Sequence, residues 1–304
     1  MLDKRVKTVT MVSALALLVS CSGASGQDEV VQNAAPQAAT PQVAVEPPPE
    51  ITEYMQSPAI LVFSKTAGWR HNEGIAGADR YFADLAHEKG HGLFTTANAA
   101  VFNAEDLARF DVVVFNNATG DGLTAEQEAA FQAWYAEEGA WIGLHGSGDA
   151  SQNNWLWYQS TFIGPEFIGH IMAPQFQTAR LVGLNLEHPV LADMPAVFEL
   201  EDEWYSFDAP AQAHGMTPIV GLDETSYQPT NTVVADWPSD LRMGNDPTDH
   251  PIIWSSCSGQ GRSVYSGVGH TQFVYDSEDY QKLLSNAFDW VTRKSDADGA
   301  FCPD

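Results

Sequence analysis

Apolar and polar positions in the middle of this chain follow the periods of strands and helices in turn. The apolar runs 59–64 (AILVFS) and 111–115 (DVVVF) are typical of strands covered on both faces of a parallel sheet. Residues 75–89 place apolar side chains on one helical stripe, and the capping box at 124–127 starts another helix. A buried strand at 141–144 follows. This order predicts the α/β class, with a parallel sheet between layers of helices.

The later part of the domain has a more β-rich pattern. Two short apolar runs joined by SGQG at 258–261 predict an antiparallel hairpin. Ser277 is placed to cap a final amphipathic helix. The elements that we expect here are strands at 180–186, 198–207 and 218–222, hairpin strands at 252–256 and 263–266, and a helix at 278–293.

Residues 1–20 are typical of an export signal rather than of a folded segment. Basic residues open them, and the apolar run that follows is shorter than the ~20 residues that a membrane-spanning helix needs. The segment ends in Leu18-Val19-Ser20-Cys21, which resembles the lipobox of bacterial lipoproteins. We therefore expect Cys21 to carry a lipid. An ordinary cleaved signal with a chance cysteine is the alternative.

The rest of the chain divides by composition into a tether, a domain and a tail. Residues 21–56 are rich in Ala, Pro and Gln without a regular period, which predicts a disordered, partly extended tether. Residues 57–294 form the expected domain, and residues 295–304 form a short C-terminal tail. We expect the domain in the cell envelope, on the periplasmic face or at the outer membrane, held to the membrane by the lipid anchor only.

The chain is strongly acidic, with a formal net charge of −26. Nucleic-acid binding requires Lys and Arg clustered on one face, so this charge argues against that partner. It also argues against anionic substrates, which the field of the protein would repel. Small neutral ligands such as sugars are unaffected by this charge.

Two cysteines, Cys257 and Cys302, remain once Cys21 is assigned to the lipid anchor. In an oxidising compartment they can form a disulfide that holds the tail against a late strand. Two free thiols are the alternative, and the sequence does not choose between them.

Three histidines with glycine beside or close to them are the leading candidates for chemistry. His145 directly follows the predicted strand 141–144, and α/β sheets bind ligands at the carboxyl ends of their strands. Imidazoles can bind Zn²⁺ or another divalent ion, and they can equally act as general acids and bases. The spacing along the chain leaves both roles open. The metal-binding set that we expect is His145, His170 and His270.

Further candidates lie near the same edge of the predicted sheet. Trp69 and His71 follow the first strand. In the segment 201–205 (EDEWY), strand alternation puts Asp202 and Glu203 on opposite faces, and we favour Glu203 as the acid of the site. The expected catalytic set is His145, His270, His71 and Glu203.

Polar and aromatic residues beside these strands are candidates for substrate binding. Asparagine amides are strong hydrogen-bonding groups, although they are equally common in turns. Aromatic rings suit stacking on a pyranose, although they are more common in a hydrophobic core. The expected substrate-binding set is Trp69, Asn116, Asn117, Trp155 and Tyr158.

Several of these segments, taken together and in order, resemble the ThuA-like (trehalose utilisation) family across residues 59–294. They are LVFSKT at 61–66 leading to Arg70-His71, GLHG at 143–146, FIGH at 167–170, DEWY at 202–205 and GVGH at 267–270. The resemblance implies the fold of class I glutamine amidotransferases, a flavodoxin-like doubly wound, mostly parallel sheet with helices on both faces. Those enzymes carry a nucleophilic cysteine at the position that corresponds to His145, so glutamine amidotransferase activity is not expected.

The resemblance links the chain to the catabolism of trehalose and related disaccharides through 3-keto sugars, so the partner that it implies is a small neutral sugar or disaccharide. We expect an exported protein that processes a glycoside or 3-keto-glycoside by acid/base or metal-assisted chemistry, with zinc as the metal considered. A 3-keto group acidifies the neighbouring C–H, so elimination of the glycosidic bond needs only a well-placed base. Histidines suit this chemistry better than the paired carboxylates of ordinary glycosidases. The alternative is a non-catalytic sugar-binding lipoprotein.

Overall fold

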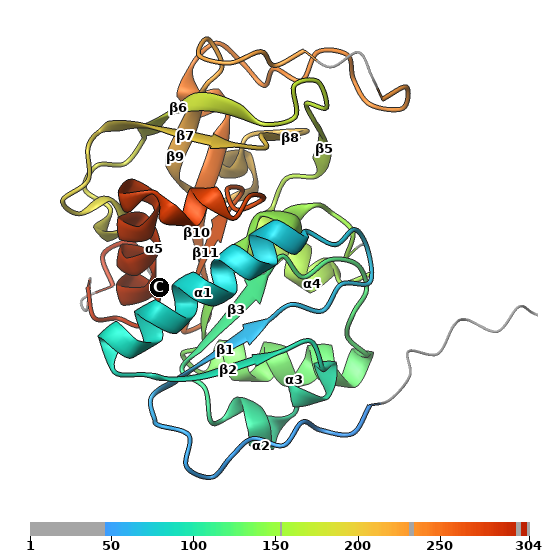
Figure 1. Cartoon of the computed structure of the whole chain (residues 1–304), viewed down its shortest axis with the longest axis vertical. Coiled ribbons are helices and arrows are strands. Elements are labelled where there is room, and N and C mark those ends of the chain that lie inside the picture. Colours follow the sequence, from blue (N-terminus) through green and yellow to red (C-terminus); the bar gives the residue numbers. More distant parts are fainter. Residues whose placement is uncertain (1–45, 153, 231–233, 296–298, 303–304) are drawn as a thin grey trace, which may run out of the picture. The chain divides into compact units, whose positions relative to one another are not determined.

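The computed structural model describes residues 46–152, 154–230, 234–295 and 299–302. The predicted export signal, Cys21 and most of the tether lie outside these ranges, so they stay predictions. The described residues contain a nine-stranded sheet, a separate two-stranded sheet and five α-helices (Figure 1).

The large sheet has the strand order β2-β1-β3-β4-β11-β10-β9-β6-β7. The first five strands pair in parallel, and the remaining pairings are antiparallel. The mixed α/β class is therefore confirmed. The strands are β1 (Ala59–Phe63), β2 (Gly92–Thr96), β3 (Val112–Asn116), β4 (Ala140–Leu144), β6 (Gln177–Gly183), β7 (Val197–Asp202), β9 (Thr217–Asp223), β10 (Pro251–Ser258) and β11 (Gly261–Ser266), with β5 (Phe167–His170) and β8 (Tyr205–Phe207) forming the small sheet.

The helices are α1 (Asn72–Lys89), α2 (Ala104–Leu107), α3 (Ala125–Ala136), α4 (Leu156–Tyr158) and α5 (Glu278–Val291). α1 and α5 lie side by side over the sheet (Figure 1), where Lys89 Nζ is 2.6 Å from Asp289 Oδ2. The hydroxyl of Tyr81 also donates a hydrogen bond to the carbonyl of Gln281 at 2.8 Å. These contacts join the middle and the C-terminal end of α1 to α5.

Aromatic side chains fill the core beneath β3 and β4. The ring of Trp141 on β4 stacks on Phe162 at a centroid distance of 4.2 Å, and Phe115 on β3 stacks on Phe131 of α3 at 5.5 Å. All four rings are at most 1% exposed. Close packing of this kind holds the end of β4, and with it His145, in one position.

Local predictions agree with the structure where local chemistry decides them. Thr124 forms the predicted capping box of α3, and Ser277 caps α5. β10 and β11 form the predicted hairpin. The predicted strand 198–207 is instead divided into β7 and β8, because the chain leaves the large sheet after Asp202 and joins β5 from Tyr205 onward.

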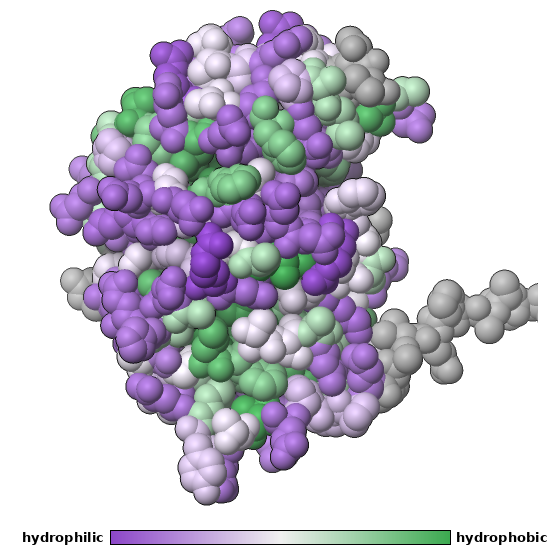
Figure 2. Space-filling view, in the orientation of Figure 1, coloured by the Kyte–Doolittle hydropathy of each residue, from purple (hydrophilic) through white to green (hydrophobic). Residues whose placement is uncertain are grey.

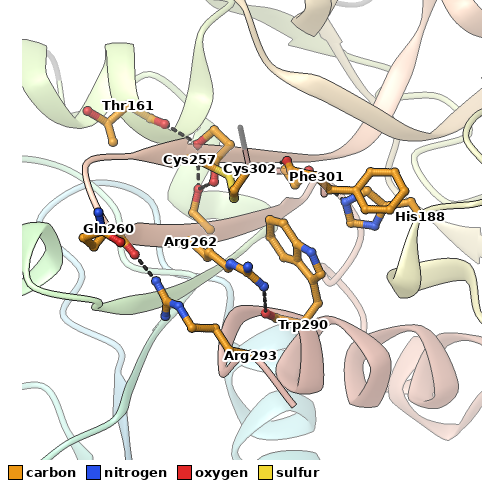
Figure 3. The surroundings of a disulfide bond; sticks show 12 residues. Thr161, His188, Cys257, Gln260, Arg262, Trp290, Arg293, Phe301 and Cys302 are labelled. Atoms are coloured by element: carbon orange, nitrogen blue, oxygen red, sulfur yellow. Dashed lines mark hydrogen bonds between the residues drawn. A yellow bond between two sulfur atoms is a disulfide. The ribbon is translucent and has the colours of Figure 1, made fainter. Parts of the chain in front are cut away.

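Cys257 of β10 and Cys302 of the tail form a disulfide, with their Cα atoms 5.7 Å apart (Figure 3). Beside it, the ring of Phe301 lies 4.7 Å from that of His188. The disulfide therefore holds the tail covalently to β10, and Phe301 packs against His188 in the loop after β6.

The face of the molecule that carries α1 and α5 is largely hydrophilic, with scattered hydrophobic residues (Figure 2). Among the described residues, no helix combines the length and the apolar character that crossing a bilayer requires.

Candidate active site

Loops at the carboxyl ends of parallel strands carry three of the candidate histidines. β1, β4 and β11 run in the same direction, so these strands end at one edge of the sheet. His71 lies between β1 and α1, His145 directly follows β4, and His270 lies in the loop after β11. His71 directly precedes α1 but makes no side-chain capping bond, which leaves its imidazole for the site.

Glu203 directly follows β7, which is the edge strand at the antiparallel end of the large sheet. Four antiparallel pairings separate β11 from β7, so β7 runs in the direction of β11 and ends at the same edge. In a flat sheet the five places between β4 and β7 would separate them by about 24 Å, at ~4.8 Å per strand. Yet Glu203 Oε2 lies 3.2 Å from His145 Nε2. The twisted sheet must therefore curve, so that the loop after β4 and the loop after β7 come together.

The Glu203 carboxylate is the centre of the cluster. Its Oε2 atom lies 3.2 Å from His145 Nε2 and 3.2 Å from His270 Nδ1, and these two nitrogens are 3.1 Å apart. Its Oε1 atom lies 3.0 Å from His170 Nδ1 and accepts a 2.6 Å hydrogen bond from Gln175 Nε2. The Glu203 carboxylate thus contacts three imidazoles, two through Oε2 and one through Oε1.

His145 occupies a strained elbow at the end of β4. Its φ is 36°, in the left-handed region that residues other than glycine rarely adopt. Two hydrogen bonds hold this conformation: its Nδ1 donates to the carbonyl of Gly267 at 2.8 Å, and its own carbonyl accepts from the Tyr265 hydroxyl at 2.9 Å. Because a carbonyl only accepts, Nδ1 carries a hydrogen and Nε2 faces Glu203.

Asp202 positions the loop that carries His270. This fully buried carboxylate accepts hydrogen bonds from the backbone N–H groups of Gly269, His270 and Thr271, at 2.6, 3.1 and 3.1 Å. Burial raises the pKa of Asp202. These two neighbouring residues therefore have different roles. Asp202, the last residue of β7, fixes the loop of His270, and Glu203, directly after β7, contacts the imidazoles.

His71 closes the cluster from the side of α1. Its ring centroid lies 4.9 Å from those of both His145 and His270. The hydroxyl of Tyr205 lies 3.4 Å from His71 Nε2. A Cβ at Gly146 would lie only 2.7 Å from His71 Nδ1, so the glycine that follows His145 allows the two histidines to come close.

Burial and mutual contact set the charges of these groups. Burial, together with the imidazoles of His145 and His270, lowers the pKa of His71 to about 2, so His71 is neutral. Burial also lowers the pKa of His170. Burial would raise the pKa of Glu203, but the nearby imidazoles lower it well below its usual range. Burial would lower the pKa of His145, but the carboxylate of Glu203 raises it.

Solvent reaches the cluster through two of its members. The side chains of His170 and His270 are 14% and 15% exposed, whereas those of His145 and Glu203 are almost completely buried. The ring of Phe176, itself 40% exposed, lies 5.1 Å from that of His270. A substrate would therefore meet His170, His270 and exposed aromatic surface first.

The structure brings the predicted catalytic residues His71, His145, Glu203 and His270 together. His170 stands on the other oxygen of Glu203, outside this set of four. Among the predicted substrate-binding residues, Trp69 is 74% exposed, which leaves its ring open to a ligand.

Four other residues predicted to bind substrate have structural contacts. Trp155 and Tyr158 are 5% and 1% exposed and stack on each other in the core, which favours the core interpretation that the sequence left open. Asn116 is fully buried and donates to the carbonyl of Ile75 at 3.0 Å. Asn117, also fully buried, accepts a 3.1 Å hydrogen bond from the backbone N–H that follows His145.

Sequence reasoning missed three contributors to the site. Strand alternation placed Asp202 away from the site, but the chain turns after this residue and the alternation no longer applies. The EDEWY segment was the available signal for Asp202 and Tyr205. Nothing in the sequence singles out Gln175, which lies in the loop before β6.

The model of the family described as ThuA, trehalose utilisation, matches residues 59–291. The chain belongs to the ThuA family. A solved ThuA-like protein from Bacteroides uniformis is 22% identical with a TM-score of 0.65, and the match covers 83% of this chain and 98% of that chain. A second one, from Parabacteroides merdae, is 14% identical with a TM-score of 0.57, covering 79% and 91%. Comparison with curated proteins finds no match. These likenesses show the fold that the ThuA chain shares with them.

Proposed function

We propose that this ThuA protein is an exported enzyme of disaccharide utilisation that processes a glycoside or 3-keto-glycoside. One observation carries the proposal: two partly exposed imidazoles, those of His170 and His270, share the single buried carboxylate of Glu203. This arrangement holds two proton-transfer groups in fixed positions at the accessible side of the site. The family's link to trehalose utilisation supports a disaccharide as the substrate.

The elimination of a 3-keto-glycoside needs only proton transfers. A base removes the proton from the carbon between the ketone and the glycosidic carbon. The electron pair of that C–H bond forms a carbon–carbon double bond, the glycosidic C–O bond breaks, and the leaving oxygen takes up a proton. The products are an unsaturated keto sugar and the released sugar, so no oxidant or reductant is consumed.

The contacts suggest how the residues divide these steps. His170 is neutral at neutral pH because burial lowers its pKa, so it can accept the proton. His270 is the second accessible imidazole and is placed to donate to the leaving oxygen. His145 is completely buried, so in this scheme it acts through Glu203 and does not touch the sugar.

Exposed aromatic side chains support a neutral sugar as the ligand. Trp69, two residues before His71, is 74% exposed, and Phe273, three residues after His270, is 68% exposed. Phe176 lies against His270 itself. Flat rings of this kind pack well on the apolar C–H face of a pyranose, and they require no positive charge on the protein.

The test is turnover of 3-keto-trehalose by the purified full-length chain, followed by product analysis. His170→Ala and His270→Ala should each lower kcat by about 10²-fold or more, the usual contribution of a general acid or base. His214→Ala, which removes an exposed histidine elsewhere, should leave turnover unchanged. Equal turnover by all four proteins would refute the proposal. Sugar binding seen by calorimetry, with no product, would favour the non-catalytic sugar-binding lipoprotein.

Export and lipid anchoring form a separate part of the proposal. The Cys257–Cys302 disulfide supports an oxidising compartment. We expect the full-length chain to fractionate with membranes and the Cys21→Ala variant to appear in the soluble fraction. Soluble wild-type protein would argue for an ordinary cleaved signal.

A further inference from the structure

We propose that four side chains of this site bind one divalent transition-metal ion, with zinc as the first candidate. Each offers one ligand atom, and all of these atoms lie within 4.8 Å of one another. The four residues are His71, His145, Glu203 and His270. The inference concerns the site of the proposed function, but it does not depend on any sugar chemistry.

Three of the ligand atoms form a nearly equilateral triangle. Its sides are 3.1 Å between His145 Nε2 and His270 Nδ1, and 3.2 Å from each of these nitrogens to Glu203 Oε2. Metal–ligand bonds of about 2.0–2.1 Å place neighbouring ligand atoms about 3.3 Å apart in a tetrahedron and about 2.9 Å apart in an octahedron. The triangle therefore has the size of one face of a coordination polyhedron around a single ion.

Hydrogen bonds satisfy this triangle only when His145 Nε2 and His270 Nδ1 both carry hydrogens, which makes His145 a cation, whereas one bound ion satisfies it with neutral imidazoles. His145 Nδ1 already donates its hydrogen to the carbonyl of Gly267, so a neutral His145 points a lone pair at the Glu203 carboxylate. Two acceptor atoms at 3.2 Å need a positive charge between them. A proton on His145 Nε2 can point to Glu203 or to His270, but not to both. One metal ion can accept lone pairs from all three.

Two buried polar atoms of the cluster have no hydrogen-bond partner among the residues that the structure describes. They are Oε2 of Glu203 and Nδ1 of His71. Buried polar atoms in folded proteins are nearly always paired, so each such exception calls for a missing partner. A cation bound to Oε2 would supply that partner for Glu203. An imidazole nitrogen of His71 lies within reach as the fourth ligand.

The outer contacts are those that metal ligands usually have. Metal-bound histidine normally donates its other ring N–H to a carbonyl or carboxylate, as His145 does to Gly267. Gln175 donates to the second oxygen of Glu203, which keeps Oε2 turned inward. Asp202 fixes the loop of His270 through three backbone hydrogen bonds. Outer partners of this kind orient ligands before the ion arrives.

The donor set also indicates the class of ion. Three imidazole nitrogens and one carboxylate suit zinc and its first-row neighbours, whereas Mg²⁺ and Ca²⁺ prefer oxygen ligands. A formal net charge of −26 on the chain favours any cation, but the nitrogen-rich site selects among them.

The experiment is metal binding by the purified full-length chain, first stripped with a chelator. Titration with Zn²⁺ in a calorimeter should show one equivalent bound per chain, and elemental analysis after dialysis should agree. Glu203→Gln keeps the side-chain volume. Each of the single variants Glu203→Gln, His145→Ala and His270→Ala should weaken zinc binding by more than the roughly 10–100-fold that loss of an outer partner costs. His214→Ala should bind as the wild type does.

Co²⁺ in place of Zn²⁺ reports the ligands directly, because its visible absorption depends on their number and type. His71→Ala should change this spectrum, and His170→Ala should leave it unchanged. Binding below one equivalent, or unchanged binding in the Glu203→Gln and His270→Ala variants, would overturn the inference. A Co²⁺ spectrum that changes in His170→Ala and not in His71→Ala would also overturn the proposed set of four ligands. Because no sugar is present, the result stands apart from the turnover test.

Discussion

The close approach of α1 to the loop of His270 gives the sharpest prediction. Gly74 is the third residue of α1, and a Cβ built on it would lie 2.2 Å from the carbonyl oxygen of Gly269 and 2.9 Å from that of His270. Real Cβ contacts essentially never fall below 3.0 Å, so Gly74→Ala must separate these backbones by about 0.8 Å (3.0 − 2.2). Both neighbours are backbone, so a side-chain rotation cannot relieve the clash.

The expected cost has two parts. Overpacking costs about 1–3 kcal/mol, and the higher helix propensity of alanine returns up to about 1 kcal/mol, so unfolding in urea should show a loss of about 1–2 kcal/mol. If the proposed function holds, displacing the loop that carries His270 by nearly 1 Å should cost on the order of 10²-fold in turnover. Gly74→Ala should therefore damage site function far more than stability, although residue 74 is no ligand.

Gly122→Ala is the matched control. A Cβ at Gly122 would meet the side chain of Lys65 at 3.5 Å and the carbonyl oxygen of Gly120 at 3.9 Å, and both distances are ordinary contacts. This variant should keep wild-type stability within about 0.5 kcal/mol and should keep full turnover and zinc binding. If Gly74→Ala behaves in the same way, the reasoning about the close approach is refuted.

The remaining predictions concern three other features. Asp202→Asn should lower the free energy of unfolding by about 2 kcal/mol in urea, because an amide offers one acceptor oxygen fewer to three backbone donors. Burial lowers the pKa of His91 below its ordinary 6.5, so its protonation favours the unfolded chain, and stability is lost as pH falls below 6.5. His91→Gln should flatten that loss in urea titrations between about pH 7.5 and 5.5. Cys257→Ser with Cys302→Ser should cost about 4 kcal/mol, since the disulfide spans 45 residues.

Each of these predictions has its own control. Glu201→Gln changes the exposed neighbour of Asp202 and should be neutral, so equal effects at both positions would count against the buried anchor. His87→Gln, an exposed histidine on α1, should leave the pH dependence as it is in the wild type. Adding a reductant to the wild type should reproduce the double serine variant, and identical stability with and without reductant would contradict the disulfide prediction.

The sequence by itself determined the elements and the edge at which the chemistry lies. Apolar period and capping residues depend on neighbours within a few positions, so strands such as β4 and the start of α3 could be predicted from local pattern. Parallel strands end at one edge, which placed His71 and His145 near each other without any knowledge of contacts. Composition could not separate the core role of Trp155 from a binding role, because both favour an aromatic ring.

Only the tertiary structure decided how the cluster is assembled. Glu203 directly follows β7, a strand five places from β4, and no local pattern shows that the sheet curves enough to bring its carboxylate to His145. The same curvature places Asp202 under the loop of His270 and sets His170 on the far oxygen of Glu203. These contacts join residues more than 25 positions apart, so they depend on packing of the whole domain, and packing is not encoded in the neighbours of any one residue.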